Sequence, residues 1–225
     1  MSVKPLLRKL ISVTVFLLVS MIALFWILRY SEDQKFSRQF KAKVEPLIGL
    51  LTDESGKLLL KESEIVDTLQ KSSCLREENI HQIGNVKLYL PHCEFQGRDT
   101  TIFAIFADSK GYGGWIKVLA LFERQKDRTM KLWKVKVLDA RDETEGLGKN
   151  VLSDEFQKRF YNVPESGLEK GLKLDLEEFP PTFDAEEAKK EGFILVADIM
   201  SYATVSAKAV ANAIQVMYNY LKNLN

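Results

Sequence analysis

The spacing of apolar residues changes along the chain and predicts three kinds of element. Residues 10–28 form an uncharged apolar run, residues 31–60 carry apolar side chains every three or four positions, and from about residue 85 the period shortens to two. A period of three or four is typical of an amphipathic helix, and a period of two is typical of a half-buried strand. The pattern therefore predicts an apolar helix, a helical stalk and a sheet-containing domain, in that order.

The third region contains several short apolar runs bounded by turn residues, which predict strands. These strands are expected at residues 86–90, 101–106, 116–123, 132–138 and 173–176. Short helices are expected at 152–160 and from Asp184 to Gly192, with a loop and turn at 162–171 between them. A buried strand at 193–197, a polar turn at 198–204 and a long helix towards Leu221 complete the chain. The predicted fold class is α/β (α+β), with a single sheet-containing domain behind the N-terminal helix and the stalk.

The apolar run from Leu10 to Leu28 has 19 residues, close to the roughly 20 that a membrane-spanning helix needs. A cleaved signal peptide is the competing interpretation, but its apolar region would be shorter, about 7–15 residues, and no small-residue cleavage pattern follows. We therefore expect a transmembrane anchor. Positively charged residues flank it on both sides, so they do not decide its orientation. The expected divisions are a cytoplasmic N-terminus at 1–9, the anchor at 10–28, a stalk and connecting region at 29–84, and the domain at 85–225.

Composition excludes several classes of function. A chain of 225 residues with 46% hydrophobic content suits one buried domain with a small appendage. The net charge is +1 and no block of like charges stands out, which argues against a nucleic-acid partner. The sequence has two histidines, close together, and no Ser-His-Asp set, phosphate-binding loop or metalloprotease motif, which argues against a hydrolase.

The two cysteines, Cys74 and Cys93, allow three interpretations. An even number of cysteines suits a disulfide in an oxidising compartment, which weakly favours an extracytoplasmic domain. A zinc site that also uses His81 and His92 ranks lower, because the usual paired spacing of ligands is missing. Two free thiols are a third interpretation with nearly the weight of the disulfide.

Three segments are candidates for a ligand site: Gly111–Gly114, Glu143–Gly148 and Asp198–Thr204. The last lies between a predicted strand and a predicted helix, where unpaired N–H groups and the helix dipole suit a phosphate. Taken alone, it could hold only an N-cap residue, Ser201 or Thr204, worth about 1 kcal/mol. The glycines could likewise be turn residues that need positive φ, although those around Leu147 would also let a flat ring approach the backbone.

Taken together, the three segments resemble the FMN-binding domain family. Residues 198–204, DIMSYAT, are similar to the D-x-x-[ST]-G-A-T flavinylation motif, and residues 143–148, ETEGLG, to the E-T-P-G-L-G motif. The family includes the G subunit of Rnf electron-transport complexes and the C subunit of the sodium-translocating NADH:quinone reductase. The residues GYGG at 111–114 and the lack of a long insert are more similar to the Rnf member. The resemblance covers roughly residues 100–221.

This resemblance implies one cofactor, FMN, attached to Thr204 as a phosphoester by a separate magnesium-dependent flavin transferase that uses FAD. It places Glu143, Thr144, Leu147 and Gly148 beside the isoalloxazine ring. The other residues expected at the cofactor are Ser201, Ala203 and Gly113, and no catalytic residue or metal ligand is expected. The domain would face the outside of the bacterial cytoplasmic membrane, with the N-terminus inside and other membrane subunits as partners.

Two residues depart from the family motifs. Tyr202 stands where the motif has glycine, which would be unfavourable if that position needs a positive φ or close passage of the transferase. Glu145 replaces proline, which would loosen the turn and place a negative charge near the flavin. Both changes lead us to expect incomplete flavin attachment or an altered redox potential.

The first function hypothesis is therefore an electron-transfer subunit that carries covalent FMN in a membrane-bound, Rnf-type, ion-translocating oxidoreductase complex. Such a subunit relays electrons between other subunits and has no turnover alone. Alternatives are an assembly or sensory module without flavin, and the equivalent subunit of the sodium-translocating reductase. A stand-alone FMN reductase ranks last, because the sequence has no nicotinamide-binding fingerprint.

Overall fold

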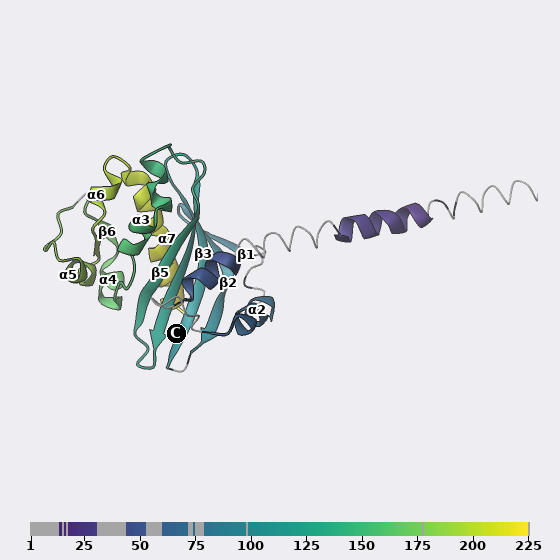
Figure 1. Cartoon of the computed structure of the whole chain (residues 1–225), viewed down its shortest axis with the longest axis horizontal. Coiled ribbons are helices and arrows are strands. Elements are labelled where there is room, and N and C mark those ends of the chain that lie inside the picture. Colours follow the sequence, from purple (N-terminus) through teal and green to yellow (C-terminus); the bar gives the residue numbers. More distant parts are fainter. Residues whose placement is uncertain are drawn as a thin grey trace, which may run out of the picture. The chain divides into compact units, whose positions relative to one another are not determined.

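The computed structural model describes residues 14, 16, 18–30, 44–52, 60–71, 74, 79–97, 99–176 and 178–224 (Figure 1). The chain divides into two compact units, Met1–Val44 and Glu45–Asn225. The second unit contains residues 45–84, which the sequence led us to expect in a stalk and connecting region outside the domain. Each unit is described by itself below.

In the first unit, residues 18–30 are helical and most of their large apolar side chains are exposed. Residues 10–13, 15 and 17 of the expected anchor, and residues 31–43 of the expected stalk, lie outside the described residues. Within the ranges that the structure describes, no helix reaches both the length and the mean hydropathy needed to span a membrane.

The second unit is built on an antiparallel sheet whose five described strands follow one another in chain order. They are β1 (Asn79–Ile83), β2 (Val86–Gln96), β3 (Thr100–Lys110), β4 (Trp115–Gln125) and β5 (Met130–Asp139). The strands expected at 86–90, 101–106, 116–123 and 132–138 are confirmed as β2 to β5. The sequence did not predict β1, because this edge strand is exposed at all five positions and has no apolar alternation.

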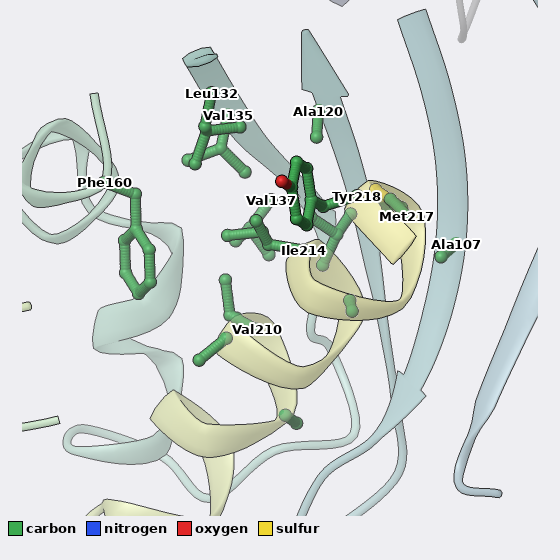
Figure 2. Packing of buried hydrophobic residues seen from close by; sticks show 14 of the residues in the cluster. Ala107, Ala120, Leu132, Val135, Val137, Phe160, Val210, Ile214, Met217 and Tyr218 are labelled. Carbon is green, nitrogen blue, oxygen red and sulfur yellow. The ribbon is translucent and has the colours of Figure 1, made fainter. Parts of the chain in front are cut away.

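One face of the sheet packs against α7 (Thr204–Lys222), the long C-terminal helix that the sequence predicted. Alternate side chains of each strand point to this face. Figure 2 shows Val210, Ile214, Met217 and Tyr218 of the helix, with strand residues such as Ala120 nearby. All five are buried and belong to one continuous hydrophobic core. This packing fixes the helix on the sheet and so fixes the position of its first residue, Thr204.

The other face is covered by residues 45–52 and by α2 (Glu62–Lys71), which contacts β2 (Figure 1). Leu47, Leu51, Ile65 and Leu69 of these segments are fully or almost fully buried. The ammonium group of Lys134 on β5 donates a hydrogen bond of 2.5 Å to the carbonyl of Thr52. Both faces of the sheet are therefore covered, and residues 45–52 and 62–71, which precede the expected domain, contribute to its fold.

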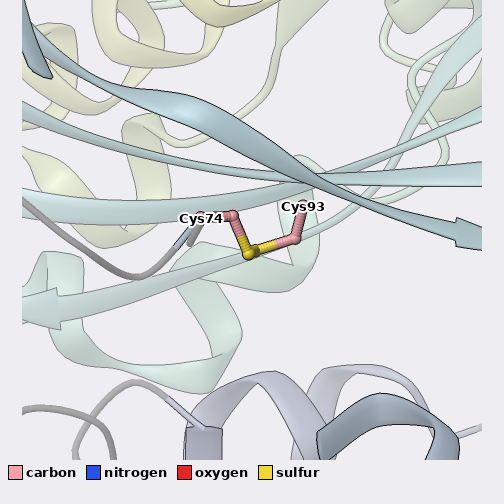
Figure 3. The surroundings of a disulfide bond; sticks show 2 residues. All are labelled: Cys74 and Cys93. Atoms are coloured by element: carbon pink, nitrogen blue, oxygen red, sulfur yellow. A yellow bond between two sulfur atoms is a disulfide. The ribbon is translucent and has the colours of Figure 1, made fainter. Parts of the chain in front are cut away.

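Cys74 and Cys93 form a disulfide, as the first interpretation of the sequence predicted (Figure 3). Cys93 lies on β2, so the bond ties the segment that follows α2 to the sheet. The pairing consumes both thiols and so contradicts the two alternatives, the zinc site and the free cysteines. Closing a loop of this size stabilises the fold by about 3 kcal/mol in the chain-entropy description.

The remaining elements lie between β5 and α7. They are the 3-10 helix η1 (Gly148–Leu152), α3 (Asp154–Arg159), α4 (Glu165–Lys170), β6 (Lys173–Leu174), α5 (Ala185–Lys190), β7 (Phe193–Ile194) and α6 (Ala197–Met200). The helices expected near 152–160 and after Asp184 are confirmed, and the side chains of Ser153 and Asp184 cap them. The loop expected at 162–171 is wrong, because α4 forms there.

The strand expected at 193–197 is shorter than predicted. Only Phe193 and Ile194 pair, in parallel with β6. The carboxylate of Asp175 accepts hydrogen bonds from the backbone N–H groups of Val196 (2.7 Å) and Ala197 (2.9 Å). Because a side chain takes these two donors, the strand stops and α6 begins at Ala197. The main sheet is antiparallel, so the α+β description fits and a doubly wound α/β sheet does not.

Candidate functional site

A buried carboxylate lies where two of the three candidate segments meet. Glu143 is 4% exposed, and its Oε1 accepts hydrogen bonds from the backbone N–H groups of Gly113 (3.1 Å) and Gly114 (3.3 Å). Its Oε2 accepts a 2.5 Å hydrogen bond from the hydroxyl of Ser206 on α7. A buried charge is tolerated only when such donors replace water. Glu143 therefore fastens the β3–β4 connection to the first turn of α7, and we call this set of four residues the Glu143 junction.

An ion pair fixes the turn that leads from β5 to Glu143. The guanidinium of Arg141 lies 2.5 Å from the carboxylate of Asp139, which also accepts a 3.0 Å hydrogen bond from the Arg141 backbone N–H. These bonds from Arg141 lower the pKa of Asp139 below its usual range. Asp139 is therefore negatively charged at neutral pH, and the turn keeps this pair at the entrance to the Glu143 segment.

The glycines of the β3–β4 connection are needed because the chain passes very close to Asp142. A Cβ built on Gly113 would lie 1.9 Å from the backbone oxygen of Asp142, and one on Gly114 would lie 2.5 Å from the Asp142 Cβ. The expectation that Gly111, Gly113 and Gly114 serve positive φ angles is wrong, since none of them has one. Their missing side chains are what let this connection reach the Glu143 carboxylate.

The segment Glu143–Gly148 turns sharply and presents Leu147 to solvent. Gly146 has a φ of +79°, and Gly148 is buried with its Cα so close to Thr144 that an added Cβ would lie 2.4 Å from the threonine Oγ1. Leu147, between the two glycines, is 44% exposed. A partly exposed apolar side chain between two small residues is available to pack against a flat ring.

Glu145, which stands in place of the motif proline, forms an ion pair with Lys149. The two residues are four positions apart, the spacing at which a glutamate and a lysine compensate each other's charge on a helical turn. Lys149 therefore lies beside the negative charge that Glu145 adds, and the effect of that charge on the redox potential of a flavin stays a prediction.

The segment Ser201–Thr204 links α6 to α7. Ala203 is buried and donates its N–H to the carbonyl of Met200 at 2.9 Å, which closes the turn. Tyr202 has a φ of +69° and its side chain is 95% exposed. This confirms that the motif glycine position needs the left-handed conformation, which a tyrosine adopts only with strain. The hydroxyl of Ser201 donates to the carbonyl of Ala197 at 2.7 Å, so it has a structural partner.

Thr204 is the first residue of α7 and is half-buried. No described side chain caps this end of the helix, and the first turn contains no acidic residue. The interpretation that Ser201 or Thr204 only caps the helix is therefore not supported. The first N–H groups of a helix and its positive dipole end attract an anion. The backbone donors at the start of α7 fit a phosphate, and the hydrogen bond from Ser206 ties this first turn to Glu143.

Two further contacts tie the helices that follow the second segment, η1 and α3, to α6 and the third segment. The amide of Asn150 on η1 donates a 3.1 Å hydrogen bond to the carbonyl of Ile199 on α6. Asp198 of the flavinylation motif pairs with Arg159 of α3 at 2.6 Å. Sequence reasoning missed the roles of Asn150 and of Ser206, because no local pattern links residues so far apart in the chain.

A cavity of about 500 Å³ lies away from these segments. It is lined by residues of the β4–β5 turn and α4, including Thr129, Met130 and Glu165, and it shares no residue with the three segments. The site therefore rests on the junction of the segments, where Tyr112, Leu147, Tyr202 and Val205 expose large apolar surfaces.

Comparison with known proteins agrees with this geometry. Residues 111–219 match the sequence model of the FMN-binding domain. This part of the chain belongs to the FMN-binding domain family. The match begins at Gly111, the first residue of the β3–β4 connection, and includes the whole Glu143 junction and Thr204. The FMN-binding domain thus contains each residue that the sequence analysis assigned to the cofactor.

The FMN-binding domain is also similar to a solved structure. A crystal structure from Thermotoga maritima, described as a proposed RnfG subunit of an electron transport complex, superimposes with a TM-score of 0.64 and 26% sequence identity. The alignment covers 82% of this chain and 98% of that protein. The similarity therefore extends beyond the FMN-binding domain to most of the second compact unit. No curated protein sequence matches the chain.

Proposed function

We propose that this protein is an electron-transfer subunit that carries FMN on Thr204, through a phosphoester, within a membrane-bound, Rnf-type, ion-translocating oxidoreductase complex. The observation that carries the proposal is the position of Thr204. It stands at an uncapped helix start, two residues from Ser206, which is tied to the Glu143 junction. A hydroxyl placed there can bear a phosphate whose charge the helix dipole stabilises.

The residues around Thr204 divide into supporting and contacting groups. Glu143 is buried and both of its carboxylate oxygens accept hydrogen bonds, so it would position the site and not touch the ring. Leu147 is the apolar side chain available to the isoalloxazine, beside Thr144 and Gly148. Bound FMN would supply reversible one-electron and two-electron transfer. A covalent bond would keep the flavin in place where no free pool could replace it.

The proposed location is the bacterial cytoplasmic (inner) membrane, with one spanning helix at residues 10–28 and the domain on the extracytoplasmic side. The uncharged apolar run in the sequence supports the anchor. The Cys74–Cys93 disulfide supports an oxidising compartment for the domain. The description of the Thermotoga maritima protein supports other subunits of an electron transport complex as partners.

Expression with a flavin transferase tests the attachment. We expect the denatured wild-type band to fluoresce in a gel, and Thr204→Val to abolish the fluorescence because it removes the only oxygen that could form this ester. Thr101→Val is the matched control, since it makes the same change on β3, outside the three segments, at a threonine whose hydroxyl donates a hydrogen bond to Gln96. Fluorescence retained in Thr204→Val would contradict the assignment.

One observation favours a second candidate, an assembly or sensory module without flavin. Tyr202 holds a strained conformation with a large exposed side chain at the position where a transferase would approach. A wild-type protein that stays unmodified beside an active transferase, while Tyr202→Gly is modified, would favour this second function.

A further inference from the structure

The connection between β6 and α5, residues 175–184, exposes two phenylalanines. Phe179 is 93% exposed and Phe183 is 84% exposed. Both are far more exposed than Leu147 at the proposed flavin site. Large aromatic side chains left in water favour burial against a partner, since each buries a large apolar area on contact. We call residues 175–184 the acidic-aromatic loop.

Hydrogen bonds and an ion pair hold the loop at both ends. At its start, Asp175 accepts the backbone N–H of Val196 at 2.7 Å, and Glu178 pairs with Lys173 at 2.9 Å. At its end, the Asp184 N–H donates to the hydroxyl of Thr182 at 3.1 Å, and Asp184 caps α5. A segment held in this way loses less conformational entropy on binding than a free one. The two phenylalanines are thus presented on an anchored support.

The loop and the first turn of α5, which follows it, are together strongly acidic. Residues 174–188 contain six Asp or Glu and no Lys or Arg, and residues 173–190, which include the flanking lysines, still have a net charge of −3. Anionic lipid surfaces attract basic segments and repel acidic ones, so a bilayer is a poor partner for these phenylalanines. A surface that buries the rings and complements the carboxylates must combine an apolar groove with Lys or Arg at its rim.

We propose that the acidic-aromatic loop docks a neighbouring protein subunit through an apolar groove rimmed by basic residues. The partner would be another subunit of the redox complex. In this respect the docking inference rests on the proposed function. Asp175 links the loop to the site, because its carboxylate accepts hydrogen bonds from Val196 and from Ala197, the first residue of α6, and α6 leads into Ser201–Thr204. A partner docked here would contact the loop that holds α6, and α6 leads into the proposed flavin-bearing turn.

Photo-crosslinking in native membranes tests the docking. A benzoylphenylalanine probe replaces Phe179 or Phe183 in the full chain, and the control probe replaces Ile83, an apolar residue that is 49% exposed on β1. We expect both loop probes to join one other subunit, at a peptide containing Lys or Arg, with a yield about tenfold above the control. Glu186→Gln with Glu187→Gln should lower that yield about threefold or more.

Adducts with lipid, adducts with a second copy of this chain, or yields equal to those at Ile83 would overturn the docking proposal. A yield that the Glu186→Gln and Glu187→Gln changes leave unaltered would overturn the basic rim. In-gel flavin fluorescence of the same samples reports the proposed function separately. Cross-links that persist without fluorescence contradict only the flavin attachment, and fluorescence that persists without cross-links contradicts only the docking.

Discussion

Two segments of the proposed flavin site are built in opposite ways. The Gly111–Gly114 connection is closed, because Asp142 fills the space beside its glycines and the buried Glu143 carboxylate holds its N–H groups. The Ser201–Thr204 turn is open, because Tyr202 points into solvent and Thr204 is only half-buried. Both segments connect to the start of α7. The first does so through Glu143 and its hydrogen bond with Ser206, and the second continues directly into the helix at Thr204.

This difference indicates that the closed segment supports the start of α7, whereas the open segment leaves Thr204 accessible to a modifying enzyme. The closed segment can tolerate no added atom, so it sets the position of the start of α7 on the sheet. The open segment can be reached by a modifying enzyme, and its strain of about 1–3 kcal/mol at a left-handed tyrosine is offset by the surrounding contacts. Changes in the closed segment should therefore act on stability, and changes in the open segment should act on flavin attachment.

The largest expected effect is that of Gly113→Ala. The new Cβ would lie 1.9 Å from the Asp142 backbone oxygen, so the connection must move away from Glu143. We expect a loss of about 3–4 kcal/mol in the free energy of unfolding, measured with urea and tryptophan fluorescence. Gly146→Ala is the control, since no atom lies within 4 Å of its added Cβ and only its φ of +79° opposes the change. Equal losses in the two variants would contradict the closed geometry.

Glu143→Ala should have the second largest effect. It leaves the N–H groups of Gly113 and Gly114 and the hydroxyl of Ser206 without their acceptor, at a cost of about 2–3 kcal/mol. Glu143→Gln should cost only about 1 kcal/mol, because the amide oxygen can still accept and the Ser206 hydroxyl can accept in return. Urea unfolding of both variants measures the difference. An alanine variant as stable as the glutamine variant would show that the junction contributes little.

Tyr202→Gly should have a smaller effect of opposite sign. Glycine relieves the left-handed strain and loses more unfolded-state entropy, so a net gain of about 0.5–1 kcal/mol remains. Tyr202→Ala keeps a Cβ in the same backbone conformation and should give no gain. The fraction of protein that carries fluorescent flavin should also rise in Tyr202→Gly. Fluorescence reports access of the transferase to Thr204, whereas urea unfolding reports stability. A gain in Tyr202→Ala equal to that in Tyr202→Gly would assign the effect to the side chain.

The smallest effect concerns His92, on β2, whose ring meets those of Phe103 and Tyr220. Burial lowers the pKa of His92 below 6.5, so the unfolded state binds a proton more readily than the folded state. The contribution of His92 to the free energy of unfolding is fully present above the unfolded-state pKa of about 6.5 and is lost as the pH falls below that value. Between pH 7.5 and 5.5, wild-type protein should lose more stability than His92→Gln in urea unfolding. Equal losses would exclude His92 as the source.

The sequence predicted the helices and strands whose buried residues leave an apolar pattern along the chain. Strands β2 and β5 alternate buried and less buried residues, β3 and β4 contain continuous apolar runs, and α7 repeats apolar residues every three or four positions. Strand β1 is exposed at every position and has no such pattern. The strand at 193–197 was predicted too long because Asp175, about twenty residues earlier, takes the backbone donors that would extend it. Such long-range competition cannot be seen in a local pattern.

The candidate site was predicted in its pieces and not in its assembly. Motif resemblance gave Glu143 and Thr204, and the positive φ at Tyr202 agrees with the glycine that the motif has there. The sequence did not indicate that Glu143 is a buried support, since its partner Ser206 lies 63 residues away. Only the packing of α7 on the sheet brings the two together.

Peptide mass spectrometry tests whether Thr204 carries FMN. Trypsin cleavage after Lys190 and Lys208 releases residues 191–208, which contain Ser201, Thr204 and Ser206. For protein isolated from cells with an active flavin transferase, we expect this peptide to gain the mass of one FMN less one water and fragment ions to place the gain on Thr204. An unmodified peptide, or a gain located on Ser201 or Ser206, would contradict the attachment of FMN to Thr204.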